Sequence, residues 1–435
     1  MKIVFINPYI SNDKSYPDYP PIGILSMSSL LKEAGYSVFF LDAQFEQLSV
    51  DQISAKIKKI VPDLIGITIN VVQAKSALVY INELKKIFPS IPLVIGGPFV
   101  TGFGKETFDH IKEADFAVQG EGEEAIVNLV NHLDGRFALE DIDNLIYKNN
   151  GQIITNPLKR IFDINALPLP DYDLIKDHIN LYTPPHPSIA QPSMHIMCSR
   201  GCPFKCQFCS SPTIWGRKVI YRNVESVIEE VDLLISKFGV KEIFFQDDTL
   251  NARKKWFFEL CHQLIETKLN EKAYFKCPFR VNKKILSREL LQIAKKANFW
   301  MIFYGVENGN QAMLQSMNKG IKIRDIKRAF DLSKQVGIKT FASFMVGNIG
   351  ETEETYRDSI NLMKEIKSDY GGFAFAIPFP GSELYNVALS KRHIEINDFV
   401  SEFTTDRCIV RTDKLDSKRI QELTMQANQL MVDKN

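Results

Sequence analysis

Short apolar runs alternate with amphipathic helical patterns along residues 1–135. Apolar runs rich in β-branched and aromatic residues predict strands at residues 2–7, 37–42, 64–70, 92–97 and 115–119. A helix is predicted at residues 22–35, where the amphipathic pattern ends at a glycine. Strands separated by helices of this length are typical of α/β proteins. The first part of the chain is therefore predicted to form a doubly wound, Rossmann-like parallel sheet.

The same alternation resumes after a hairpin and a proline-rich connector. The hairpin is predicted at residues 143–156, with Asn149-Asn150-Gly151 at its turn, and the connector extends from residue 167 to residue 192. Further strands are predicted at residues 194–198, 242–247, 274–280, 300–307, 340–347 and 373–378, and helices at residues 224–238, 253–267 and 353–367. Six β-α units of this kind predict an open, partial TIM-type (β/α)6 barrel.

These patterns divide the chain into four parts. The parallel-sheet domain is predicted at residues 1–140, the hairpin and linker at 141–192, and the barrel at 193–390. The remaining residues, 391–435, are predicted to form a carboxy-terminal helical tail with a closing helix at residues 417–432. A length of 435 residues allows two or three domains, each with a core of its own.

Charge and composition narrow the classes of protein. The formal net charge is +1, which gives no electrostatic support for binding nucleic acid or for a polybasic membrane anchor. The chain starts with a short apolar run that lacks a signal-peptide cleavage region, and no stretch has the apolar length of a membrane span. Three of the seven cysteines are clustered, which fits a reducing compartment. We therefore expect a cytoplasmic protein with no nucleic-acid partner and no transmembrane segment.

The three clustered cysteines follow the first predicted barrel strand in the order Cys-x-x-x-Cys-x-x-Cys. Cys202, Cys206 and Cys209 cannot all pair as disulfides within one loop, and thiolates are soft metal ligands. Zinc would usually take a fourth protein ligand, but the sequence has no second Cys-x-x-Cys or histidine pair. Three thiolates suit a 4Fe-4S cluster with one iron left open, and a loop of free thiols is the alternative.

This stretch resembles the signature of the radical S-adenosylmethionine (radical SAM) family. In that signature an aromatic residue precedes the last cysteine, and Phe208 occupies this position. The resemblance implies that Cys202, Cys206 and Cys209 hold a 4Fe-4S cluster whose open iron binds SAM.

The other four cysteines have different expected roles. Cys198 lies four residues before Cys202 and could offer a fourth sulfur, but a triad counted from it departs from the family pattern. We interpret Cys198 as the end of a buried strand. Cys261, Cys277 and Cys408 are isolated, and isolated cysteines are more often small core residues than reactive ones.

Glycines follow two of the predicted strands in the amino-terminal sheet. Ligands of doubly wound sheets lie at the carboxyl ends of the strands, and glycine there lets the backbone approach a ligand closely. Gly96-Gly97-Pro98 and then Gly120-Glu121-Gly122-Glu123, after Pro20-Pro21-Ile22-Gly23, resemble the cobalamin-binding domain that precedes many radical SAM modules. The resemblance implies cobalamin contacts at Asn7, Pro8, Thr68, Asn70, Gly96, Gly97, Gly120 and Glu121.

The amino-terminal domain departs from the cobalamin pattern at one feature. Many such domains carry Asp-x-His-x-x-Gly, whose histidine ligates cobalt, but residues 8–12 contain no histidine. Phe99 also stands where relatives often place a histidine. A domain that binds a nucleotide, or nothing, is the alternative, although the nucleotide fingerprint G-x-G-x-x-G is missing. We expect cobalamin to bind with no protein histidine below the cobalt.

Carboxylates end two of the predicted barrel strands. Asp247-Asp248-Thr249 resembles the family segment that receives the methionyl amino group of SAM, and a helix N-cap is the alternative. Gly305-Val306-Glu307-Asn308 resembles the family's Gly-x-Glu-Ser segment. A glutamate that closes an apolar strand is costly unless it is paired. SAM is one candidate partner of Glu307, and Arg280 is the structural alternative.

A third segment, Gly347-Asn348-Ile349-Gly350-Glu351-Thr352, resembles the family's Gly-x-Pro-Gly-Glu-Thr turn, whose backbone would border the adenine. Ile349 replaces the usual proline, which predicts a looser turn. The residues that the resemblance assigns to SAM are Phe208, Asp247, Asp248, Glu307, Gly347 and Glu351.

The resemblance as a whole is to the cobalamin-binding radical SAM enzymes, and it implies three cofactors: a 4Fe-4S cluster, SAM and cobalamin. It implies that a 5′-deoxyadenosyl radical takes hydrogen from an unactivated carbon of a small molecule, and that methylcobalamin delivers the methyl group. An electron donor such as flavodoxin or ferredoxin is the implied partner. Two alternatives remain open: a radical cyclisation or rearrangement without methyl transfer, and a non-catalytic Fe-S redox module.

Overall fold

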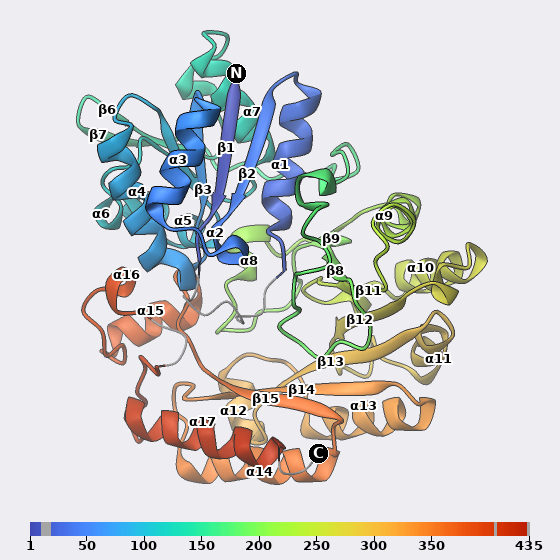
Figure 1. Ribbon diagram of the computed structural model, residues 1–435. Coiled ribbons are helices and arrows are strands. Elements are labelled where there is room, and N and C mark those ends of the chain that lie inside the picture. Colours follow the sequence, from blue (N-terminus) through green and yellow to red (C-terminus); the bar gives the residue numbers. More distant parts are fainter. Residues whose placement is uncertain (10–18, 404–406, 433–435) are drawn as a thin grey trace. The chain divides into compact units, whose positions relative to one another are not determined.

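The computed structural model describes residues 1–9, 19–403 and 407–432, and it divides the chain into two compact units (Figure 1). The first unit contains Met1–His178, Thr213–Trp215 and Ile396–Thr405. The second contains Ile179–Pro212, Gly216–Glu395 and Asp406–Asn435. Residues 10–12, on which part of the histidine argument rests, lie outside the described residues.

The first unit is built on a seven-stranded sheet with the order β2-β1-β3-β4-β5-β6-β7. Neighbouring strands are parallel from β2 to β5, whereas β6 and β7 form an antiparallel hairpin on β5. The strands are β1 (Lys2–Asn7), β2 (Ser37–Asp42), β3 (Leu64–Thr68), β4 (Leu93–Gly96), β5 (Phe116–Val118), β6 (Leu145–Asn149) and β7 (Gln152–Thr155). The predicted parallel sheet is confirmed, and the hairpin extends it.

Helices connect these strands and bury their apolar faces on the sheet. The longer helices are α1 (Ile22–Glu33), α3 (Val50–Ile60), α4 (Ala74–Ile87) and α7 (Glu123–Leu133). On one face, Ile3 and Phe5 of β1 pack with Ile126 and Leu129 of α7 in a continuous apolar core. Gly66 must lack a side chain, because a Cβ there would lie 2.6 Å from the Phe5 ring.

The second unit is built on six parallel strands in the order β15-β14-β13-β12-β11-β8. The strands are β8 (Ser193–Ile196), β11 (Glu242–Phe245), β12 (Tyr274–Phe279), β13 (Phe299–Glu307), β14 (Lys339–Val346) and β15 (Tyr370–Phe375). Their connecting helices include α9 (Val224–Ser236), α10 (Lys254–Glu266), α11 (Arg288–Lys296), α13 (Ile323–Val336) and α14 (Glu353–Ile366). β8 and β15 form the two edges of this half-barrel, so the predicted open, partial barrel is confirmed.

A buried ion pair fastens the connector to the first residues of the barrel strands. Lys276 and Glu242 are both 0% exposed, and their Nζ and Oε1 atoms lie 2.6 Å apart. Lys276 Nζ also donates to the carbonyl of Pro187 (2.9 Å), and Glu242 Oε2 accepts from the backbone N–H of Ile189 (3.0 Å). The His186 ring packs 5.0 Å from the Phe303 ring, between centroids, and burial lowers its pKa to about 4, which keeps it neutral.

The carboxy-terminal helix covers the edge strand of the half-barrel. α17 (Ser417–Val432) has the bounds predicted from the sequence and packs on β15 (Figure 1). Asn428 Oδ1 accepts from the backbone N–H of Phe373 (2.8 Å), and its Nδ2 donates to the Phe373 carbonyl (2.9 Å). The side chain thus supplies both groups that a neighbouring strand would supply, which protects the edge.

The predicted tail is divided between the two units. Residues 396–403 group with the first unit, where α16 (Phe399–Glu402) packs on α4. The Phe399 ring lies 6.2 Å from the Phe103 ring, between centroids. The rest of the described tail, including α17, groups with the second unit.

Candidate functional site

The cysteine loop follows β8 and a two-residue strand, β9 (Ser199–Arg200), and so lies at the carboxyl end of the half-barrel's first strand. Two backbone bonds fix the loop: Gln207 N–H donates to the Met317 carbonyl (2.9 Å), and Leu384 N–H donates to the Gln207 carbonyl (2.9 Å). Segments more than a hundred residues further along the chain therefore position it. This is the place where active residues of parallel β-α barrels lie.

The three loop thiols lie in a shared, partly buried environment. The pKa of Cys209 is raised to about 11, chiefly by burial and to a smaller extent by the neighbouring Asp248 carboxylate and the thiols of Cys206 and Cys202. Burial also raises the pKa of Cys202, whose Sγ lies 3.7 Å from Thr249 Oγ1. Within the described residues, no three or more His, Cys, Asp or Glu side chains are arranged so that they could hold a metal ion. The donor set of three thiols on one loop fits an iron–sulfur cluster by its chemistry.

Cys198 differs from the three loop cysteines. It is completely buried between β8 and β9, and its backbone N–H donates to Asp247 Oδ2 (3.2 Å). Burial raises the pKa of its thiol well above the ordinary value. Such an environment is typical of an inert core thiol.

Arg280 follows β12 and contacts the loop from the neighbouring strands. Its Nη1 donates to Cys206 Sγ (3.5 Å), and its Cζ lies 3.7 Å from the centroid of the Phe204 ring. Arg280 was the structural alternative to SAM as a partner of Glu307, and the structure does not pair these two residues. Arg280 instead lies against the cysteine loop, because Lys319 already occupies the position beside Glu307.

Glu307 forms a buried ion pair with Lys319. Their Oε1 and Nζ atoms lie 2.6 Å apart, and the side chains are 8% and 9% exposed. Glu307 adopts a positive φ of 65°, and Gly305 leaves the space that the pair needs, since a Cβ at Gly305 would lie 2.8 Å from Lys319 Nζ. Lys319 Nζ also lies 5.4 Å from the centroid of the Phe208 ring. The pair thus links the end of β13 to the cysteine loop.

The two aspartates after β11 have different environments. Asp247 is buried and accepts from Ser199 Oγ (2.5 Å) as well as from the Cys198 N–H, so it ties β11 to the residues that precede the cysteine loop. Burial raises its pKa to about 6. Asp248 is exposed and accepts from the hydroxyl of Ser211. Asp248 is therefore the more accessible carboxylate of the two.

Glu351 closes the turn after β14. Its carboxylate is buried and accepts from Gly347 N–H (2.5 Å) and from Asn308 Nδ2 (2.8 Å). Burial raises its pKa to about 7. Asn348 Nδ2 is buried with no hydrogen-bond partner among the described residues, and so is Arg280 Nη2. The turn therefore holds a donor that is available to a ligand.

The strand ends of the first unit form a polar network. Asn7 Nδ2 donates to Asp42 Oδ1 (2.9 Å), and Gln73 Nε2 donates to Asn7 Oδ1 (2.8 Å) and to the Pro8 carbonyl (2.6 Å). Gln73 Oε1 accepts from Asn70 N–H (3.0 Å). Three predicted cobalamin contacts, Asn7, Pro8 and Asn70, are thus brought together by Gln73.

The glycines at the strand ends lie close to the backbone or side chains of neighbouring segments. Gly97 has a φ of 101°, and a Cβ there would lie 2.8 Å from the Ile69 carbonyl, one residue beyond Thr68. Gly120 N–H donates to Thr101 Oγ1 (2.9 Å), and Glu121 Oε2 accepts from Ile161 N–H (2.6 Å). These glycines and Glu121 shape the sheet edge and attach the linker to it.

Sequence reasoning missed Lys319 and Gln73. Lys319 lies in no family motif, and only the cost of burying Glu307 indicates that a cation must be near. Gln73 follows a strand end by five residues, and a single glutamine carries no pattern signal.

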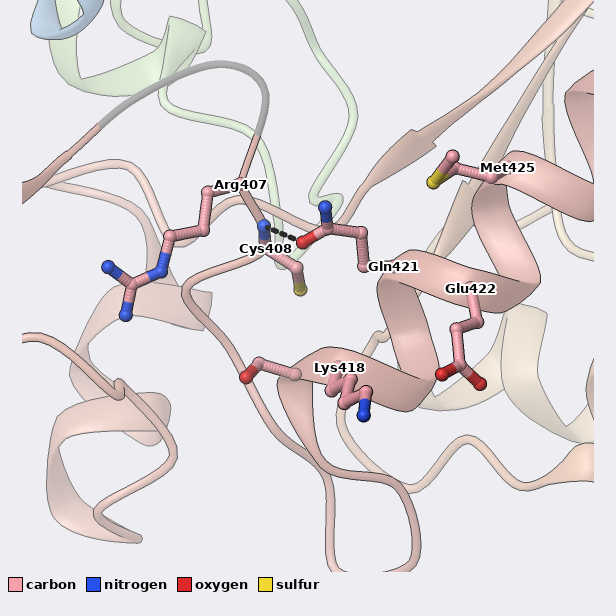
Figure 2. A pocket seen from close by; sticks show the side chains of 7 residues that line it. Arg407, Cys408, Lys418, Gln421, Glu422 and Met425 are labelled. Atoms are coloured by element: carbon pink, nitrogen blue, oxygen red, sulfur yellow. Dashed lines mark hydrogen bonds between the residues drawn. The ribbon is translucent and has the colours of Figure 1, made fainter.

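A cavity of about 550 Å³ lies between residues 407–408 and α17 (Figure 2). Cys408 N–H donates to Gln421 Oε1 (3.3 Å) at its edge. Its lining residues are Arg407, Cys408, Ser417, Lys418, Gln421, Glu422 and Met425, which differ from the residues predicted from the sequence.

Two known families match the chain in the order that the structure shows. Residues 10–130 match the B12 binding domain, and residues 196–363 match the Radical SAM superfamily. The protein is a cobalamin-binding radical SAM enzyme. The two family matches imply SAM, a 4Fe-4S cluster and cobalamin as its cofactors. Across the described residues, no helix is both long enough and apolar enough to cross a membrane.

Related proteins extend over nearly the whole chain. An uncharacterized methyltransferase of Pyrococcus horikoshii is 29% identical over 409 residues, which are 94% of this chain and 86% of the relative. The anaerobic magnesium-protoporphyrin IX monomethyl ester cyclase of Rubrivivax gelatinosus is 29% identical over 434 residues, with 98% and 76% covered. The radical S-adenosylmethionine methyltransferase TsrM of Kitasatospora setae, solved with cobalamin and a 4Fe-4S cluster, matches with a TM-score of 0.73 at 16% identity, covering 91% of this chain and 76% of that one. The last likeness shows the shared fold.

Proposed function

We propose that the protein transfers a methyl group from SAM to an unactivated carbon of a small-molecule substrate. The observation that carries the proposal is the three-thiol loop at the carboxyl ends of the half-barrel strands, in a chain that also has a B12 binding domain. The methyltransferase name of the Pyrococcus horikoshii relative supports methyl transfer as the reaction. When bound, the cluster and SAM supply a radical, and cobalamin carries the methyl group.

Cys202, Cys206 and Cys209 are assigned as the cluster ligands. They share one loop and influence one another electrostatically. The backbone contacts of Gln207 hold this loop in place, so the protein's task is to present three thiolates and keep water away from them. Cys198 is left out, because its thiol is enclosed in the core.

The predicted SAM residues divide into contacts and supports. Asp248 is accessible and suits the SAM ammonium group, whereas Asp247 already accepts hydrogen bonds from Ser199 and Cys198 and supports the loop. Glu307 and Phe208 are assigned to SAM binding through Lys319, which lies beside both of them.

The turn after β14 is assigned to the adenosine part of SAM. Glu351 holds Gly347 and Asn308 in place, so the backbone of this turn and the unpartnered Nδ2 of Asn348 present a fixed polar edge. Such a donor can recognise a ring nitrogen or a ribose hydroxyl.

Cobalamin is assigned to the strand ends of the first unit. Asn7, Pro8 and Asn70 are preorganised by Gln73, and Thr68, Gly96, Gly97, Gly120 and Glu121 form the rest of the edge. An electron donor of the flavodoxin or ferredoxin class completes the system as a partner.

Isotope-labelled SAM tests the proposal. Full-length protein, reconstituted anaerobically with iron, sulfide and cobalamin, is incubated with CD3-labelled SAM, dithionite and candidate small molecules, and the products are analysed by mass spectrometry. We expect the CD3 group on the protein-bound cobalamin and on the product carbon. Cleavage of SAM to 5′-deoxyadenosine with the label retained entirely in methionine would contradict methyl transfer.

That second outcome would favour a radical cyclisation or rearrangement. The cyclase of Rubrivivax gelatinosus is as similar to this chain as the methyltransferase relative is, and it covers 98% of the chain. A product without added mass is what this second function predicts.

A further inference from the structure

Arg280 is held in place from several directions next to the cysteine loop. The side chain is 7% exposed, and its Nε donates to Asn282 Oδ1 (2.7 Å). Asn282 is itself fixed, because its Nδ2 donates to the Gly320 carbonyl (2.8 Å). Asn251 clamps the backbone of Arg280, accepting from its N–H (2.9 Å) and donating to its carbonyl (3.0 Å). The guanidinium therefore has one preferred position.

In that position the guanidinium contacts the cysteine loop twice, through Nη1 and through its planar face. Nη1 donates to Cys206 Sγ (3.5 Å), and the Phe204 ring stacks 3.7 Å from Cζ. Nη2 is buried and has no hydrogen-bond partner within the described part of the chain. A buried donor without a partner is costly, and here it belongs to the same fork that already holds a ligand sulfur. The arrangement is more than a packing contact, since packing on Phe204 would not require an unpaired donor.

We propose that Arg280 is a positioning residue that raises the reduction potential of the iron–sulfur centre by donating to the Cys206 sulfur. The inference rests on the proposed function, because it assumes that Cys206 is a cluster ligand. A one-electron reduction, from dithionite in the test or a flavodoxin-class donor otherwise, adds one negative charge beside the loop. A permanent cation and a hydrogen bond to a ligand sulfur both stabilise that charge.

Two substitutions separate the charge from the fork. Arg280→Met removes both the charge and the donors but keeps an unbranched apolar stem, whereas Arg280→Lys keeps the charge and loses the planar fork. Arg288→Met is the matched control, because Arg288 is an exposed arginine that donates to Gln335 on the outer helices. Each full-length protein is reconstituted anaerobically, and iron per chain is measured. The midpoint potential then follows from a dithionite titration monitored by electron paramagnetic resonance.

The expected order of midpoint potentials is wild type and Arg288→Met highest, Arg280→Lys intermediate and Arg280→Met lowest, at equal iron content. Equal potentials in all four proteins would overturn the inference while leaving the cluster assignment intact. Weaker SAM binding at an unchanged potential would also overturn it, and would assign Nη2 to the SAM carboxylate. Loss of iron from both Arg280 variants would give the residue a structural role instead of a tuning role. A wild-type protein that carries no cluster would refute the proposed function itself.

Discussion

Removing the ammonium group of Lys319 should destabilise the protein more than any exposed charge deletion. Lys319→Met keeps most of the apolar stem and leaves the Glu307 carboxylate buried without its cation. At 2.6 Å, and with an effective dielectric constant of about 20, the pair attracts by about 6 kcal/mol, which is offset by the cost of desolvating both ions. Removing one partner of a buried pair costs about 3–5 kcal/mol. We expect a loss of about 3 kcal/mol, because both side chains keep slight exposure.

The pair Lys327–Glu365 provides a matched control. Its Nζ–Oε1 distance is also 2.6 Å, but its side chains are 41% and 55% exposed. Lys327→Met should therefore cost about 0–1 kcal/mol, the usual value of a surface pair. The free energy of unfolding is measured by anaerobic urea denaturation of the full-length proteins, followed by circular dichroism.

A double substitution tests the coupling directly. Glu307→Gln combined with Lys319→Met removes both charges, so its cost should be smaller than the sum of the two single costs by more than about 1 kcal/mol. A loss below about 1 kcal/mol for Lys319→Met, with additive single and double effects, would refute the description of the pair as buried and coupled.

A further variant, Glu307→Ala, decides whether Glu307 also contacts SAM. Calorimetric titration of reconstituted Glu307→Ala should show SAM binding weakened by roughly 1–3 kcal/mol, the cost of losing one charged hydrogen-bond partner. Its iron content should match that of the wild type. Unchanged affinity in a less stable variant would make Glu307 a structural partner of Lys319 alone.

Three further predictions concern the cluster, a buried carboxyl and cobalamin. Alanine at any of Cys202, Cys206 and Cys209 should abolish SAM cleavage by protein that otherwise carries about four irons, whereas Cys198→Ala should keep most of it; loss of the cluster in the Cys198 variant alone would contradict the ligand assignment. Burial raises the folded-state pKa of Glu351 from 4.5 to about 7, so in this pH range the folded protein holds a proton that the unfolded chain has lost. The free energy of unfolding should therefore fall as the pH rises from 4.5 to 7, by on the order of 3 kcal/mol. Urea denaturation of Glu351→Gln should show a weaker pH dependence than the wild type, and an unchanged pH dependence would refute the buried carboxyl. Electron paramagnetic resonance of the cobalt(II) form should show no nitrogen splitting from a protein histidine, and such splitting would contradict the prediction that no protein histidine lies below the cobalt.

The strands and the cysteine loop were predictable from the sequence because both are marked by patterns of residues close together in the chain. The closing helix at Ser417–Val432 was predicted to the residue, since its amphipathic pattern is uninterrupted. The strand predicted at residues 373–378 instead occupies Tyr370–Phe375, because paired glycines at 371–372 hid its start and the prolines that follow cannot donate to a sheet. Within each sheet, the parallel arrangement of the strands was inferred only from the lengths of the segments that connect them.

Long-range side-chain pairs could not be read in this way. Glu307 was expected to need a partner, but its choice of Lys319 over Arg280 depends on how the loop after β13 returns to the cysteine loop. Gln73 likewise joins Asn7 and Asn70 only because β1 and β3 are neighbours in the folded sheet. Spacing in the sequence indicates which groups need a partner, and three-dimensional packing decides which group that partner is.

The most direct test of the central claim is the anaerobic formation of 5′-deoxyadenosine from SAM, measured by liquid chromatography and mass spectrometry. Reconstituted wild-type protein with dithionite should convert SAM to 5′-deoxyadenosine and methionine. A variant with alanine at Cys202, Cys206 and Cys209 should form none, while it still binds cobalamin. Wild-type protein that carries about four irons per chain yet leaves SAM intact, or a triple variant that cleaves SAM as fast as the wild type, would contradict the account.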